Sequence, residues 1–183
     1  MPPATPYADG KGFAPTDVAF TGPDEIYVTD GYGKAYFMPA GSSPFQYRGP
    51  VYGGKDISQT PHGITYDPAD KTLLVSARPE GQVKRWSRAT QRWLEVHGLP
   101  AGSTVCDVDV WGHYALAPCL NGPDQSPGPI YILNLKKRAI VSTIRPKVDL
   151  GFAEAQHIHD AAWYLMPNGR KQELYILFTH WNP

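Results

Sequence analysis

Charge of either sign is scarce in this sequence of 183 residues, and neither sign is in excess. Lys and Arg together number 17, Asp and Glu together number 17, and charged residues make up 19% of the chain, against about 25% in an average soluble domain. A balanced chain lacks the basic face with which proteins bind nucleic acid or anionic membranes. We therefore expect no nucleic-acid partner.

Long apolar runs are also missing. No stretch approaches the roughly 20 residues that span a bilayer, so we expect no membrane span. Residues 1–6, MPPATP, have neither the basic region nor the apolar core of a signal peptide. The sequence is thus expected to be that of a cytoplasmic protein, or of a mature or trimmed form. Two cysteines, Cys106 and Cys119, are too few to decide the redox compartment.

Turn residues and aromatic rings take the place of the missing charge. The chain has 18 glycines and 19 prolines, together with 11 tyrosines, 6 phenylalanines and 5 tryptophans. Strong helix formers are correspondingly few, which excludes a helical bundle. Hydrophobic residues make up 42% of the chain, enough for a sizeable core. The composition predicts an all-β domain with many short strands.

One pattern occurs four times: a small or polar pair, an alternating apolar run, a tight turn and a second apolar run. The equivalent positions in the four copies are Thr16, His62, Cys106 and His159. They are separated by 46, 44 and 53 residues, and four-stranded propeller blades repeat about every 40–50 residues. A loop of turn residues at 121–128 accounts for the longest interval. A β-sandwich also has many short strands, but the recurrence in phase favours a β-propeller.

The pattern therefore predicts a single β-propeller domain over residues 1–183, with about four blades. Inner strands are expected to begin near Pro15, Pro61, Val105 and Ile158, and helix is expected to stay below a tenth of the residues. The fourth unit contains only two strands, so the ring is incomplete. Since an open sheet edge invites pairing, we expect an exposed blade edge or a partner chain that covers it.

Four short motifs carry a resemblance to a known family. They are PTDVA at 15–19, YVTDGY at 27–32, PHGI at 61–64 and HDA at 159–161. In this order they resemble the NHL-repeat propellers, and more narrowly the catalytic propeller of the peptidyl-hydroxyglycine amidating lyases and their bacterial relatives. That family is six-bladed and splits a peptidyl α-hydroxyglycine into a peptide amide and glyoxylate. The resemblance implies a small-molecule or peptide substrate, an extracytoplasmic location and a structural calcium ion.

The resemblance also implies zinc in the central channel, held by three histidines, with a tyrosine and an arginine nearby. His62 and His159 match two of these histidines, and Tyr32 matches the tyrosine. The family's first histidine and its arginine lie in an earlier blade that has no counterpart in this sequence. His157 stands where the family usually has methionine, and Ala77 stands where aspartate is usual.

The histidines can be judged by spacing alone. His157 and His159 lie two residues apart, and side chains two apart share one side of a strand. Together with His62 from another blade they would complete the three protein ligands of a catalytic zinc site, in which bound water becomes hydroxide near neutral pH. Alternatively, both are loop residues that make hydrogen bonds at a blade edge.

Tyr32 and Arg78 are the remaining catalytic candidates. Tyr32 transfers a proton only if a nearby cation lowers its pKa; otherwise it is a packing ring. Arg78 either binds substrate or forms a structural salt bridge. Two functions follow: a zinc-dependent lyase-like propeller with a channel site, or a non-catalytic propeller that binds protein or glycan partners. The residues alone leave it open whether the protein is an enzyme.

Two further interpretations concern acids and thiols. Asp17, Asp107 and Asp160 recur one position after the aligned residues, which suits side chains that accept backbone hydrogen bonds at each blade opening. A hairpin turn at residues 111–113 would bring Cys119 close to Cys106, within reach of a disulfide. A bridge and two buried thiols both remain open.

Overall fold

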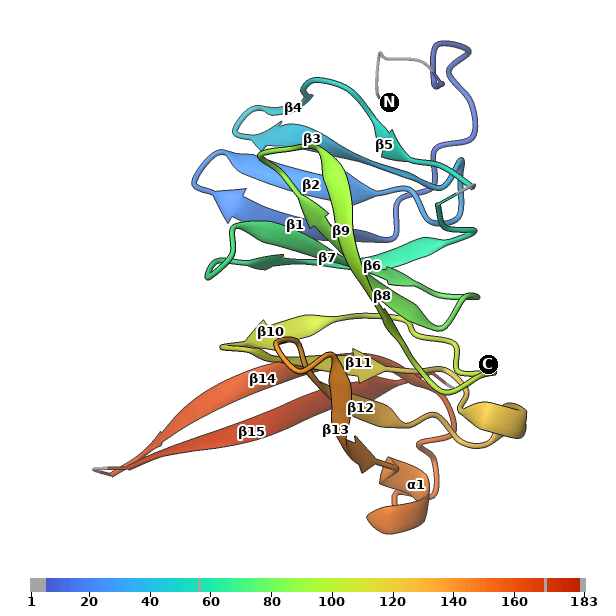
Figure 1. Cartoon of the computed structure of the whole chain (residues 1–183), viewed down its shortest axis with the longest axis vertical. Helices are drawn as coiled ribbons and strands as arrows, with labels where there is room; N and C mark the ends of the chain where they lie inside the picture. Colours follow the sequence, from blue (N-terminus) through green and yellow to red (C-terminus); the bar gives the residue numbers. More distant parts are fainter. Residues whose placement is uncertain (1–5, 56, 170, 182–183) are drawn as a thin grey trace.

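A computed structural model describes residues 6–55, 57–169 and 171–181. Its strands form four separate antiparallel sheets that follow one another along the chain. In Figure 1 the blue first sheet is at the top, the green second sheet follows it, and the third and fourth sheets, yellow to red, lie together in the lower half. Helix in the described part is confined to α1 (Pro146–Asp149) and a 3-10 turn at Pro123–Gln125, and no described helix is long and apolar enough to cross a membrane.

Each sheet is built from strands that are consecutive in sequence. The first contains β1 (Asp17–Gly22), β2 (Glu25–Thr29), β3 (Tyr36–Ser42) and β4 (Phe45–Tyr47), with β5 (Tyr52–Gly53) also paired to β3. The second contains β6 (Pro61–Asp67), β7 (Thr72–Ala77), β8 (Gln82–Ser87) and β9 (Arg92–Gly98). The third contains β10 (Asp109–Trp111), β11 (Tyr114–Pro118), β12 (Ile130–Asn134) and β13 (Ala139–Ile144). The fourth contains β14 (Ile158–Asn168) and β15 (Lys171–His180).

This arrangement confirms the all-β fold and the incomplete propeller. One inner strand starts later than the pattern predicts: β10 begins at Asp109, and Val105 forms only an isolated bridge with Cys119. The cause lies in the next residue. The carbonyl of Cys106 accepts hydrogen bonds from His62 and Ser76 of the second sheet, so it binds a neighbouring blade.

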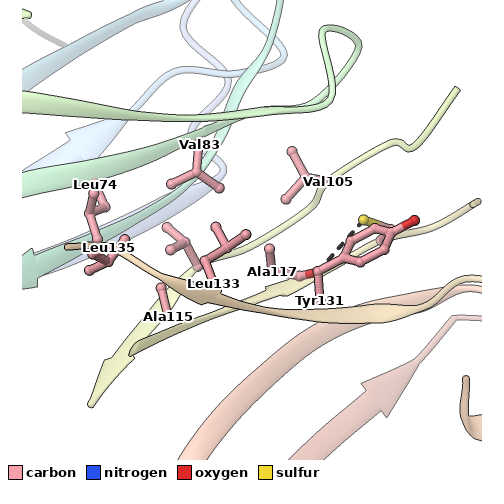
Figure 2. Close-up of a cluster of buried hydrophobic side chains, with 10 residues drawn as sticks. Leu74, Val83, Val105, Ala115, Ala117, Tyr131, Leu133 and Leu135 are labelled. Carbon is pink, nitrogen blue, oxygen red and sulfur yellow. Dashed lines mark hydrogen bonds between the residues drawn. The ribbon is translucent and has the colours of Figure 1, made fainter. Parts of the chain in front are cut away.

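The core consists of layers between successive sheets. Leu74 and Val83 of the second sheet pack with Leu133 and Ala115 of the third, as Figure 2 shows. The neighbour of Leu74 in sequence, Leu73, instead packs toward the first sheet. Successive side chains of a strand point to opposite faces, so the second sheet is buried on both faces, and β7 is buried along its whole length.

Aspartates at the blade openings hold adjacent sheets in register. Asp17 Oδ2 accepts the backbone N–H of Ile64 at 2.7 Å, which joins the first sheet to the second. Asp109 Oδ2 accepts the N–H of Trp163 at 2.8 Å, which joins the third sheet to the fourth. The inner strands are thereby fixed around a common centre.

Candidate binding site at the channel mouth

The inner strands β1, β6, β10 and β14 surround a cavity of about 290 Å³, which we call the channel. All four sheets contribute to its lining, with Asp17, His62, Asp107 and His159 among the residues that face it. Each of these residues lies at the opening of its inner strand. The repeat therefore places one polar residue from each sheet beside the channel.

His62 and His159 meet at this point. His62 is buried on β6, and its ring lies edge-to-face against that of His159 on β14, with the ring centroids 5.1 Å apart. His62 Nδ1 lies 2.8 Å from the carbonyl oxygen of Cys106. Since a carbonyl can only accept, Nδ1 carries the proton, and Nε2 has a free lone pair toward Tyr32 Oη at 3.1 Å.

Arg78 completes a chain of hydrogen bonds. It follows β7 directly, and its guanidinium donates to Tyr32 Oη at 2.7 Å and to Cys106 Sγ at 3.3 Å. Tyr32 accepts from Arg78 and donates to His62, which donates in turn to the Cys106 carbonyl. These bonds run in one direction, from Arg78 through Tyr32 and His62 to the Cys106 carbonyl, so the four residues form a directional network.

Electrostatics keep both imidazoles neutral. Burial, and after it the positive charge of Arg78, lowers the pKa of His62 to about 4. Burial, followed by Arg78, also lowers the pKa of His159. At neutral pH His62 and His159 are therefore uncharged, and Arg78 carries the positive charge among these three residues.

A second cavity of about 270 Å³, the channel mouth, opens beside this network. It is lined by Tyr32, Arg78, Leu120, His159 and Trp181. The sequence interpretation missed Leu120 and Trp181. Leu120 lies just past the end of β11 and Trp181 directly follows β15, and neither belongs to a motif. The one signal that the sequence offered for this site was an aromatic residue, Trp181, directly after the last strand.

His157 does not join the two channel histidines. Its Nδ1 contacts the Leu120 carbonyl oxygen at 3.1 Å, and its ring lies near Trp181, with the centroids 6.3 Å apart. The pairing of β14 with β15 shifts register between Ile158 and Asp160, which breaks the alternation that would have placed His157 beside His159. No three His, Cys, Asp or Glu side chains among the described residues are placed to hold one metal ion.

The resemblance implies a zinc ion held by three histidines. In the described part of the chain, two of these expected ligands, His62 and His159, lie together. The Nε2 lone pair of His62 and the adjacent His159 ring suit a metal. The bond from Nδ1 to a backbone carbonyl is the orientation common in metal-bound histidines. A third ligand is missing, so the residues present do not form a zinc centre.

Carboxylates occupy the other part of the channel. Asp107 shares a hydrogen bond with Asp160, and burial raises the pKa of Asp107 well above its usual range, with the negative charges of Asp160 and Asp17 adding to the effect. Gly63 makes room for this group, since a Cβ there would lie 2.4 Å from Asp107 Oδ1. Asp17 binds backbone N–H groups, as interpreted from the sequence, whereas Asp107 and Asp160 bind each other.

Both cysteines are free and buried. Val105 pairs with Cys119, and Cys106 N donates to the Pro118 carbonyl at 2.8 Å. Cys106 and Cys119 are thus one step apart in register. Adjacent positions point to opposite faces of a strand pair, which keeps the sulfurs from bonding.

Comparison with known proteins identifies the fold. No protein-family model and no curated protein matches the sequence. Solved structures that are similar include Sqt1 of Saccharomyces cerevisiae (TM-score 0.59, 10% identity), a chain of the mitotic checkpoint complex (0.61, 11%) and the hydrazine synthase of Kuenenia stuttgartiensis (0.56, 9%). They match 86%, 83% and 82% of this chain, which spans 38%, 42% and 53% of theirs. The first two are β-propellers, so the likeness supports a propeller fold.

Proposed function

We propose that the protein is a ligand-binding β-propeller whose channel mouth binds the carboxylate of a peptide or small molecule. Arg78 carries this proposal. Its guanidinium lines the mouth, contacts only the neutral groups of Tyr32 and Cys106 by hydrogen bond, and makes no ion pair with a described carboxylate. Its Nε is buried and has no hydrogen-bond partner in the described part of the chain. Each terminal nitrogen of Arg78 donates one of its two N–H groups within the network, and the second N–H on each suits a bidentate carboxylate.

The walls of the mouth favour an organic ligand over a simple anion. Tyr32 and Trp181 are exposed aromatic rings beside Arg78. Rings of this kind bury apolar ligand groups while their polar edges stay in water. A peptide that ends in a carboxylate offers both parts, so we assign peptides as the ligand class. Binding without catalysis is the function that these contacts support best.

A zinc-dependent lyase-like activity is the second candidate. The NHL-type motifs favour it, and so does the close approach of His62 and His159, with a tautomer of His62 that leaves Nε2 free. Only two of the expected ligands are present, so we derive no step that involves the metal. The role that we assign to Tyr32 is to hold its hydroxyl proton between Arg78 and His62. The resemblance also implies a structural calcium ion, and the metal analysis described below tests for it.

Calorimetric titration with a matched pair of peptides tests the first proposal. A tripeptide with a free carboxylate is expected to bind, while the same peptide with a carboxy-terminal amide is expected to bind at least about tenfold more weakly, since one buried charged hydrogen bond contributes 1.5–3 kcal/mol or so. Arg78→Gln should remove this preference. Arg92→Gln, on the outer strand β9 of the same sheet, is the control. Equal binding of acid and amide would contradict the proposal.

Metal analysis separates the second candidate from the first. Protein purified without chelators is measured for zinc and calcium, together with the variant His62→Gln/His159→Gln. Zinc at one ion per chain, lost in the double variant, supports the lyase-like reading. Peptide binding that persists in a metal chelator, with no bound zinc, supports binding alone.

A further inference from the structure

The fourth sheet has an apolar face that no other described element covers. The register pairs Ala162 with Leu177 and Tyr164 with Tyr175, so these four side chains share a face. Leu177 is 54% exposed, and both tyrosines are exposed as well. The other face of the hairpin packs on the third sheet through Trp163 and its neighbours. In a propeller the uncovered face is where the next blade stacks.

The first sheet has a similar open face at the other end of the stack. Val18 pairs with Val28 and Phe20 with Ile26, which places them on one face. Phe13 and Tyr47 cover Ile26 and Val28 there. On the inner strand, Val18 remains exposed and Phe20 is 67% exposed. Large side chains of this kind on an open sheet face mark an interaction surface.

The comparisons show what share of the similar chains this chain spans. More than four fifths of this chain matches each similar structure, yet it spans only 38–53% of those chains. The described chain is therefore an arc of about half such a molecule. Its two open faces lie on its first and last sheets, where a second arc of the same length would continue the stack.

We propose that a second copy of this chain completes the ring. The β14–β15 face of one copy, with Tyr164 and Leu177, packs on the β1–β2 face of the other, with Val18 and Phe20, and the twofold axis along the channel repeats the contact. Each contact joins two different faces, and the rotation closes after two copies. Closure covers both apolar faces at once. This inference is independent of any ligand at the channel mouth.

The mass of the 183-residue chain in solution, by light scattering and sedimentation, tests the proposal. We expect a dimer. Leu177→Lys and Phe20→Glu should each give a folded monomer, because both side chains project from an exposed face and a buried charge without its partner is costly. Val141→Lys is the matched control: Val141 is 49% exposed on β13, outside both end faces, and this variant should stay a dimer.

Mixing the two monomeric variants distinguishes the proposed contact from others. In the mixed pair, one interface has both wild-type faces and the other has Lys opposite Glu, so the dimer should form again. If the interface instead joined two β14–β15 faces, Phe20→Glu would remain a dimer alone. That result, or a wild-type monomer at every concentration tested, overturns the proposal; the latter would leave the end faces to a different partner.

Discussion

The imidazole of His62 lies edge-to-face against that of His159, with the ring centroids 5.1 Å apart. The two residues belong to the second and fourth sheets, and the intervening sheet contributes the Cys106 carbonyl that fixes the tautomer of His62. The contact therefore depends on three successive blades. A change in the packing of any of them alters the spacing of the two rings.

Stability should fall in acid through His62. Its pKa is 6.5 in the unfolded chain and about 4 in the folded one, so between these values the unfolded state binds more protons and the free energy of unfolding decreases as pH falls. The loss is about 3 kcal/mol by pH 4. Urea unfolding from pH 4 to pH 8 should show a shallower pH dependence for His62→Gln than for the wild type. Parallel curves would contradict the assignment.

Asp107 should have the opposite effect. Burial and the nearby charges of Asp160 and Asp17 raise its pKa, so the folded state holds the proton more tightly, and stability is lost as pH rises through the folded pKa. Asp107→Asn should remove this loss and raise Tm at pH 8 by about 3 °C, as expected for ~1 kcal/mol in a chain of this size. Asp24→Asn is the control, because Arg48 lowers the pKa of this exposed carboxylate; its Tm should not rise.

The thiols should be protected in the native state. Cys106 and Cys119 are fully buried, and burial raises the pKa of both, so neither is a ready thiolate. Without reductant, a thiol reagent should label neither cysteine in the folded protein and both in guanidinium. Fewer than two labelled thiols in the unfolded protein would reveal a disulfide.

The layer between the second and third sheets should tolerate truncation poorly. Leu133 is almost completely buried there, and Leu133→Ala is expected to lower the free energy of unfolding by about 2–5 kcal/mol, since a cavity remains in a layer packed from both sides. Val141→Ala on the exposed part of β13 should change it by less than about 0.5 kcal/mol. Denaturant titration measures both values, and a similar loss in the two variants would show that the layer is not the main core.

The second sheet shows how much of the fold could be predicted from sequence. The apolar runs of the sequence predict strands at 61–66, 72–76, 82–86 and 92–96, and the structure has Pro61–Asp67, Thr72–Ala77, Gln82–Ser87 and Arg92–Gly98. Tight turns separate apolar runs there, and both faces are buried, so local signals and tertiary packing agree. The third inner strand deviates because Cys106 binds the second sheet.

The site was predictable only where the repeat determines it. His62 and His159 share a phase in the repeat, and the structure brings them together. His157 was assigned by period-two alternation, which the register shift in β14 breaks. Leu120 and Trp181 enter the mouth because the sheets are stacked. A register shift and the stacking of distant sheets depend on three-dimensional packing, which spacing in one sequence does not encode.

The order of the strands also has a kinetic consequence. Apart from β5, every strand pairs with a neighbour in sequence, so closing each hairpin costs little loop entropy, and short-range pairing makes folding fast. During synthesis the first sheet can form while the third is still being translated. The β14–β15 hairpin follows the first three sheets along the chain, and its buried face packs against the third sheet. A folding intermediate in which this hairpin has just closed therefore exposes the apolar face with Tyr164 and Leu177.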